Sequence, residues 1–133
     1  IKRFSATDGM GITMLHRAGI KTGIVTSVNS KISEARAKKL KMEYIKLDRF
    51  DKDKAVEEIA ESEGADLSEI AFIGDDINDI SAIKIAGFSA CPADAVNDVK
   101  AVCDYVCIAD GGYGAVRELA EMILSAQEKT VTL

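Results

Sequence analysis

The chain has 133 residues, 47% of them hydrophobic and 29% charged, which suits one domain with a substantial core. Its formal net charge of −5 argues against nucleic acid or an anionic membrane surface as the main partner. No apolar run is long enough for a membrane span, and no basic segment followed by an apolar one opens the chain, so we expect no membrane partner.

Strand and helix patterns alternate along the chain with short turns between them. The predicted elements, in chain order, are the end of a strand (1–4), a helix opened by Asp8 (8–18), a strand (20–26), a helix capped by Asn29 or Ser30 and running to Leu40, a strand (42–47), a helix closed by Gly64 (52–63), a strand (70–73), a helix (77–86), a strand (88–91), a short helix (95–102), a strand (105–108) and a last helix (115–126). Repeated strand–helix units predict an α/β fold, a Rossmann-like three-layer arrangement of a parallel sheet between helices.

The three cysteines, Cys91, Cys103 and Cys107, lack the paired spacing of a zinc site. Their odd number also argues against a framework of disulfides. We interpret them as reduced and mostly buried thiols, which favours a cytoplasmic protein.

Polar residues follow several of the predicted strands. Thr26 ends one strand, Asp51 and Lys52 follow the next, and Asp75 and Asp76 follow the strand 70–73. In open parallel sheets ligands bind beyond the carboxyl ends of the strands. We therefore expect these side chains to share one edge of the sheet.

Three carboxylates, Asp75, Asp76 and Asp79, fall within five residues after a buried strand. Carboxylates brought this close repel one another unless a cation offsets their charge. Magnesium prefers oxygen ligands and commonly takes one or two carboxylates with water and substrate phosphate. The alternative is a solvated acidic helix start, stabilised by the helix dipole. We favour a metal site.

Lys52 is either a surface lysine in a charged stretch or the cation that stabilises a transferring phosphoryl group, and its spacing to Gly74 favours it over Lys54 for that role. Thr26 is either a strand-ending hydroxyl or, with the Ser27 backbone N–H, a donor to a phosphoryl oxygen. The glycine-rich turn that begins at Gly111 and Gly112 permits a tight turn and can also cradle an anion.

Four motifs carry a resemblance to a known family. They are Lys2-x-Phe4 followed by Asp8-Gly9-x-Gly11-Ile12, then Gly74-Asp75-Asp76-x-x-Asp79, Pro92-Ala93-Asp94-Ala95, and Gly111-Gly112-x-Gly114-Ala115-x-Arg117-Glu118. With them the chain resembles the 3-deoxy-D-manno-octulosonate 8-phosphate phosphatase family, a branch of the haloacid dehalogenase superfamily without a large cap domain. Relatives of that family include sugar-acid 9-phosphate phosphatases and the C-terminal domain of some acylneuraminate cytidylyltransferases.

The resemblance implies a Mg²⁺-dependent phosphatase of a sugar-acid phosphate. It also implies a homotetramer in which a neighbouring subunit helps to close the site. The implied roles are catalysis for Thr26 and Lys52, magnesium binding for Asp75 with Asp76 or Asp79, and substrate binding for Ser27, Asp8, Gly111, Gly112 and Arg117. The implied mechanism has an aspartate nucleophile, a second aspartate that protonates the leaving alkoxide, and an aspartyl phosphate that water hydrolyses.

The chain departs from the family pattern in two places. The residues after the second predicted strand are Thr26-Ser27-Val28, where the family commonly has Thr-Gly-Arg. The nucleophile strand, Asp-x-Asp-Gly, and the hairpin that follows it are not among the 133 residues. We therefore expect residues 1–133 to form one haloacid dehalogenase-like domain that lacks its first strand and hairpin and is inactive alone.

A missing first strand leaves two inner strands without a pairing partner, so we expect a groove through the core. The alternative is a rearranged sheet that pairs the strand 20–26 directly with the strand 70–73. Two other function classes stay open: a non-catalytic assembly module such as the cytidylyltransferase C-terminal domain, and a phospho-receiver domain. The order of the motifs along the chain contradicts the receiver domain.

Overall fold

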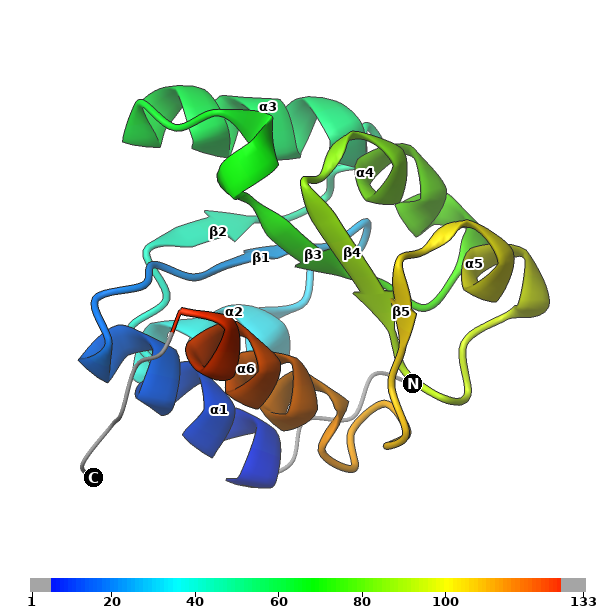
Figure 1. Ribbon diagram of the computed structural model, residues 1–133. Coiled ribbons are helices and arrows are strands. Elements are labelled where there is room, and N and C mark those ends of the chain that lie inside the picture. Colours follow the sequence, from blue (N-terminus) through cyan, green and yellow to red (C-terminus); the bar gives the residue numbers. More distant parts are fainter. Residues whose placement is uncertain (1–5, 128–133) are drawn as a thin grey trace.

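Parallel strands lie between layers of helices in the computed structural model, which describes residues 6–127 (Figure 1). The strands are β1 (Gly23–Val25), β2 (Tyr44–Lys46), β3 (Ala71–Ile73), β4 (Phe88–Cys91) and β5 (Tyr105–Val106). The helices are α1 (Ala6–Arg17), α2 (Lys31–Lys39), α3 (Lys52–Glu63), α4 (Ile80–Ile85), α5 (Asn97–Val102) and α6 (Ala115–Ala126), with 3₁₀ turns η1 (Leu67–Glu69) and η2 (Ile77–Asp79). Among these described helices, none has the length and apolar character needed to cross a membrane.

The strands form two separate sheets. β1 pairs with β2, and β3, β4 and β5 pair in that order; every pairing is parallel. β1 and β3 do not pair with each other. The rearranged sheet that would join the strand 20–26 to the strand 70–73 is therefore wrong, and the expected interruption between these strands is confirmed.

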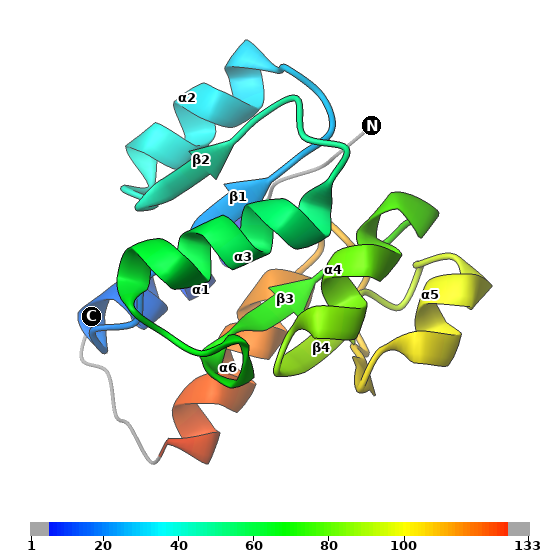
Figure 2. The same cartoon turned by 90° about the horizontal axis from the view of Figure 1, so that it is seen from above.

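Helices cover both faces of the strands. α3 and α4 lie on one face, whereas α1 and α6 lie together on the other (Figure 1). Seen from above, α3 runs over the space between β1 and β3 (Figure 2). The predicted three-layer α/β architecture is confirmed, with the sheet divided at its centre.

Several predicted element boundaries are close to the observed ones because their signals are local. α3 runs from Lys52 to Glu63, and Gly64 ends it in the left-handed conformation with φ of 63°. Ser30 caps α2, because its side chain accepts a hydrogen bond from the backbone of Ser33. The predicted helix 77–86 is instead divided into η2 and α4, and α1 starts at Ala6, before Asp8. The predicted strand 1–4 lies outside the described residues.

The buried core gathers around the second sheet and the contact between α1 and α6. Two clusters flank β4 and a third joins α1 to α6; their buried members are Ile83, Cys91, Ala95 and Val99, then Ala90, Cys107, Ala115 and Leu119, then Leu15, Ala120 and Leu124. Cys91 and Cys107 are buried, as predicted, and Cys103 is half-buried with its Sγ 3.2 Å from that of Cys91.

A groove with a volume of about 1130 Å³ runs between the two sheets. Its walls include apolar side chains of β1, β3, α1 and α6, among them Ile24, Val25, Phe72, Ile73, Ile12 and Leu119. The lining continues to Asp75 and Asp79, just beyond the carboxyl end of β3. The expected groove through the core is therefore present, and it opens at the edge where the sequence places the polar residues.

Candidate active site

A buried ion pair lies at the centre of the candidate site. Nζ of Lys52, the first residue of α3, donates a hydrogen bond to Oδ1 of Asp79 at 2.6 Å. The two side chains are only 2% and 6% exposed. A buried charge is costly without a partner, so each side chain fixes the position of the other. Lys54, two residues further on, is exposed, which supports the choice of Lys52 as the candidate cation.

The second carboxylate oxygen of Asp79 organises the turn that follows β3. Oδ2 accepts hydrogen bonds from the backbone N–H groups of Asp75 at 2.9 Å and Asp76 at 3.1 Å. Burial by itself raises the pKa of the Asp79 carboxyl, but Lys52 and these two amides outweigh it and hold the pKa below its ordinary value. Asp79 is therefore an ionised carboxylate at neutral pH, with both oxygens engaged by the protein.

Gly74 leaves the space that Asp79 needs. A Cβ added at Gly74 would lie 2.5 Å from the Cβ of Asp79 and 2.7 Å from its Cγ. Distances this short are not tolerated between non-bonded carbons, so the close approach requires glycine. The glycine that precedes the acidic motif is thus explained by the packing of Asp79 against the end of β3.

The residues after β1 face the same edge. Thr26 is buried, and its Oγ1 accepts a hydrogen bond from the backbone N–H of Val28 at 3.2 Å. Oγ of Ser27 accepts a hydrogen bond from Nδ2 of Asn78 at 3.1 Å. Ser27 follows β1 and Asn78 follows β3, so this contact joins the carboxyl ends of two strands that do not pair with each other.

Asp75 and Asp76 are exposed beside the buried pair, as a metal site open to substrate requires. Oδ1 of Asp76 accepts a hydrogen bond from the backbone N–H of Ile77 at 2.7 Å and so caps η2. Within residues 6–127, no three His, Cys, Asp or Glu side chains are arranged to hold a metal ion by themselves. The exposed oxygen donors suit a magnesium ion that completes its shell with water and substrate oxygens.

Two of the predicted substrate-binding residues, Asp8 and Arg117, are held by contacts with α6. Oδ1 of the buried Asp8 accepts hydrogen bonds from the backbone N–H groups of Val116 at 3.1 Å and Arg117 at 3.4 Å. The Arg117 side chain pairs with Glu121 on the same helix at 2.9 Å. These contacts give Asp8 a structural role as an N-terminal cap for α6, and its predicted contact with substrate stays a prediction, as does that of Arg117.

The glycine-rich turn lies at the edge of the groove. Gly111 and Gly112 both line it, and the backbone N–H of Gly111 donates to Oδ1 of Asp94 at 2.8 Å. Gly112 has φ of 76°, which explains glycine at that position. Asp94 thus ties the turn after β4 to the turn before α6, beside the carboxyl edge of the second sheet.

This arrangement agrees with comparisons to known proteins. Residues 12–116 match the family model for haloacid dehalogenase-like hydrolases. The chain is 36% identical over 130 residues to 3-deoxy-D-manno-octulosonate 8-phosphate phosphatase of Haemophilus influenzae, covering 98% of this chain and 72% of that relative. The chain belongs to the 3-deoxy-D-manno-octulosonate 8-phosphate phosphatase family. The resemblance and the haloacid dehalogenase-like fold predicted from the sequence are confirmed.

Two further proteins that resemble this family member have named functions of their own. A solved structure of 3-deoxy-D-manno-octulosonate 8-phosphate phosphatase from Moraxella catarrhalis, in complex with a magnesium ion, a phosphate ion and a KDO molecule, is 38% identical with a TM-score of 0.92. It covers 96% of this chain and 74% of the other. The N-acylneuraminate cytidylyltransferase of Oncorhynchus mykiss is 34% identical over 125 residues, covering 92% of this chain and 29% of that protein.

Two residues that position the candidate site were not predicted from the sequence. Asn78 lies inside the acidic motif, but its contact with Ser27 spans 51 positions and has no local signal. Glu118 accepts hydrogen bonds from the backbone of Ile108 and Ala109 and from the Tyr105 hydroxyl, so it fixes the segment that leads into the glycine-rich turn. The available sequence signal was its position directly after Arg117, in the motif that begins at Gly111.

Proposed function

We propose that the protein is a magnesium-dependent phosphomonoesterase that acts on a sugar-acid phosphate of the octulosonate 8-phosphate or nonulosonate 9-phosphate type. The observation that carries the proposal is the buried Lys52–Asp79 pair at the carboxyl edge of parallel strands, where Asp79 also holds the backbone of the exposed Asp75. The buried Thr26 follows a neighbouring strand at the same edge. One cation, one hydroxyl and exposed carboxylates at one edge are the groups that phosphoryl transfer requires. The magnesium, phosphate and KDO bound by the Moraxella relative support the same reading.

The residues at this edge would have separate roles in phosphoryl transfer. Lys52 stabilises the negative charge that develops on the phosphoryl oxygens, and Asp79 holds its Nζ in place. The Thr26 hydroxyl and the Ser27 backbone N–H orient the phosphoryl group. Asp75, supported by Asp76, would hold magnesium, which supplies further positive charge against the same oxygens.

We also propose that the nucleophile is a carboxylate on an extended strand that occupies the groove between β1 and β3. The facing edges of these two strands are not paired with each other, and apolar side chains line the groove between them. A parallel strand seated there would pair with both edges and direct its carboxyl end toward Lys52 and Asp75. Attack of this carboxylate on phosphorus would break the bond to the sugar oxygen, which leaves as an alcohol after a second carboxylic acid protonates it. The resulting aspartyl phosphate would then react with water, which releases inorganic phosphate and restores the free carboxylate.

The test is phosphate release by the native full-length polypeptide, with and without Mg²⁺, from octulosonate 8-phosphate, a nonulosonate 9-phosphate and glucose 6-phosphate. We expect Mg²⁺-dependent release from one of the sugar-acid phosphates and much slower release from glucose 6-phosphate. A polypeptide of residues 1–133 alone should release none. Equal rates with glucose 6-phosphate would contradict the substrate class, and turnover by residues 1–133 would contradict the groove-borne nucleophile.

Exposed apolar residues around the site support the proposed homotetramer. Val28, Phe50 and Ile77 follow β1, β2 and β3, and their exposed fractions are 51%, 74% and 61%. A neighbouring subunit that closes the site would cover such side chains. Light scattering of the native protein tests this directly. The odd number of cysteines and their unpaired spacing support a reducing compartment such as the cytoplasm.

An assembly module without catalysis is the second candidate. It is favoured by the match to the Oncorhynchus cytidylyltransferase and by Ser27-Val28 in place of Gly-Arg. The intact mass of the native polypeptide separates the two candidates. A mass several times the 14.2 kDa of this chain, together with cytidylyltransferase activity and no phosphate release, would select the module.

A further inference from the structure

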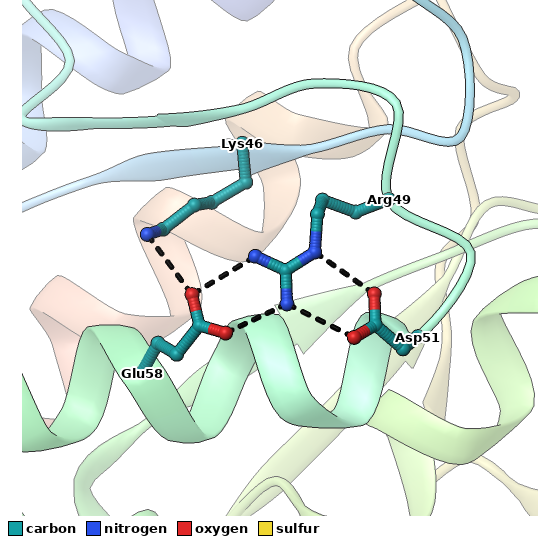
Figure 3. A network of polar contacts seen from close by, with 4 residues as sticks. All are labelled: Lys46, Arg49, Asp51 and Glu58. Carbon is teal, nitrogen blue, oxygen red and sulfur yellow. Dashed lines mark hydrogen bonds and ion pairs between the residues drawn. The ribbon is translucent and has the colours of Figure 1, made fainter.

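Arg49, in the loop between β2 and α3, joins two carboxylates: Asp51, which ends the loop, and Glu58 on α3 (Figure 3). Its Nε and Nη2 donate to the two oxygens of Asp51 at 2.8 and 3.1 Å. Its Nη1 and Nη2 donate to the two oxygens of Glu58 at 2.9 and 2.7 Å. All three guanidinium nitrogens are therefore engaged in two bidentate contacts, the geometry that makes an arginine–carboxylate pair specific. Lys46 also donates to Glu58, at 3.2 Å.

These contacts bear on the start of α3. Asp51 is the residue before the helix, directly ahead of Lys52, and its side chain makes no capping hydrogen bond to the helix backbone. Its carboxylate is instead held by Arg49. Glu58 lies on α3 itself, so Arg49 contacts one residue before Lys52 and one residue after it. These contacts link the loop to the first turns of the helix.

The main chain of the same loop contacts the residues after β1. The backbone N–H of Arg49 donates to the carbonyl of Thr26 at 2.9 Å, and that of Asp48 donates to the carbonyl of Val28 at 3.3 Å. Asp48 has φ of 56°, a conformation that costs free energy in a residue other than glycine. The surrounding contacts must therefore hold the loop in this shape, and those of Arg49 are the most extensive of the ones described for it.

We propose that Arg49 is a positioning residue, which fixes the start of α3 so that Lys52 reaches the phosphoryl site beside Thr26. This inference rests on the proposed function, because it assigns Arg49 a role in the same site. Arginine is required rather than lysine, since one ammonium cannot bridge two carboxylates with paired hydrogen bonds. The guanidinium acts through Asp51 and Glu58 and does not itself contact substrate.

A double-mutant cycle in the native full-length polypeptide tests the proposal. We expect Arg49→Gln to lower kcat about tenfold, with a smaller effect on KM, because a misplaced catalytic group mainly weakens transition-state stabilisation. Arg49→Lys should not restore the rate. In a Lys52→Met background, Arg49→Gln should cause little further loss. An equal loss in both backgrounds would show that Arg49 does not act through Lys52, and would overturn the proposal.

Lys21→Met is the matched control. Lys21 pairs with Glu63 at 2.9 Å at the other end of α3, so its loss removes an ion pair from the same helix without touching the loop. It should leave kcat unchanged. A loss of kcat like that of Arg49→Gln would indicate a general effect on α3 and contradict a specific role for Arg49.

Amide hydrogen exchange separates a failure of this proposal from a failure of the proposed function. Arg49→Gln should speed exchange over residues 47–54 and Lys21→Met should not. If the unmutated protein releases no phosphate, the proposed function fails, and the exchange result alone decides whether Arg49 holds the loop. Unchanged exchange in Arg49→Gln would overturn the proposal whether or not the protein is active.

Discussion

Lys52 and Asp79 connect the two sheets at the edge where the strands themselves do not pair. Lys52 begins the helix that follows β2, and β2 belongs to the first sheet. Asp79 follows β3, which belongs to the second sheet. Their 2.6 Å contact and that of Ser27 with Asn78 span the carboxyl end of the groove. The geometry of the candidate site and the cohesion of the domain therefore depend on the same side chains.

Replacing Lys52 should abolish most of the activity. We expect Lys52→Met to lower kcat by about 100- to 1000-fold, because it removes a preorganised positive charge from the transferring phosphoryl group. Lys54→Met, at an exposed position two residues away, should have little effect. Steady-state phosphate release measures both. If the two variants lose similar activity, Lys52 does not have the role assigned to it.

Replacing Asp79 should destabilise the protein as well as the site. Asp79→Asn keeps an oxygen acceptor for the amides of Asp75 and Asp76 but leaves the buried Lys52 without a counter-charge. Breaking a buried pair in this way costs about 3–5 kcal/mol of unfolding free energy. Urea denaturation of the native protein measures it. Glu57→Gln, on an exposed position of α3, is the control and should change the value by less than about 0.5 kcal/mol.

The contribution of Asp79 to the unfolding free energy should decrease as the pH falls into the acid range. Its pKa is depressed in the folded state, so the unfolded state binds a proton more readily. The stabilisation is therefore complete above the unfolded value of about 3.9 and is lost as the pH falls through the lower folded value. The difference in unfolding free energy between the native protein and Asp79→Asn should be constant above about pH 5 and shrink below pH 4. A difference that stays constant down to pH 3 would contradict the assigned pKa shift.

Local patterns were enough to predict most elements of the fold. α3 was predicted with its observed bounds because both signals are local: the apolar spacing lies within the helix, and Gly64 follows it directly. The interruption between β1 and β3 also followed from the sequence, once the nucleophile strand was not found among its residues. Lys52 was chosen over Lys54 by spacing alone, and the structure buries the residue that was chosen.

Contacts between distant residues could not be predicted in the same way. Asp79 belongs to a run of acids that indicates a metal site, but its oxygens are engaged by Lys52, 27 positions away, and by the turn it stabilises. Asp8 was expected to open its own helix and lie near substrate. The substrate contact stays a prediction, and the structure shows that the Asp8 carboxylate also caps a helix 108 positions along the chain, which only the packing of α1 against α6 makes available.

The capping role of Asp8 predicts a graded effect of substitution. Asp8→Ala removes the acceptor for the backbone N–H groups of Val116 and Arg117 and should cost about 0.5–2 kcal/mol of unfolding free energy. Asp8→Asn keeps an oxygen acceptor and should cost less. Denaturation of the two variants measures the difference. Equal losses would show that the charge of Asp8 matters more than its hydrogen bonds.

Two glycines of α1 should respond to alanine in opposite directions. A Cβ at Gly11 would lie 2.9 Å from Cα of Arg117 on α6, so Gly11→Ala must force the helices apart and should cost about 1–3 kcal/mol. At Gly9 the nearest atom is a side-chain carbon of Leu40 at 3.4 Å, which is ordinary contact. Gly9→Ala should therefore stabilise the protein by about 0.5–1 kcal/mol through helix propensity. Urea denaturation of both variants measures the two changes. If Gly11→Ala were also stabilising, α1 and α6 would not be in the close contact that brings Asp8 to the start of α6.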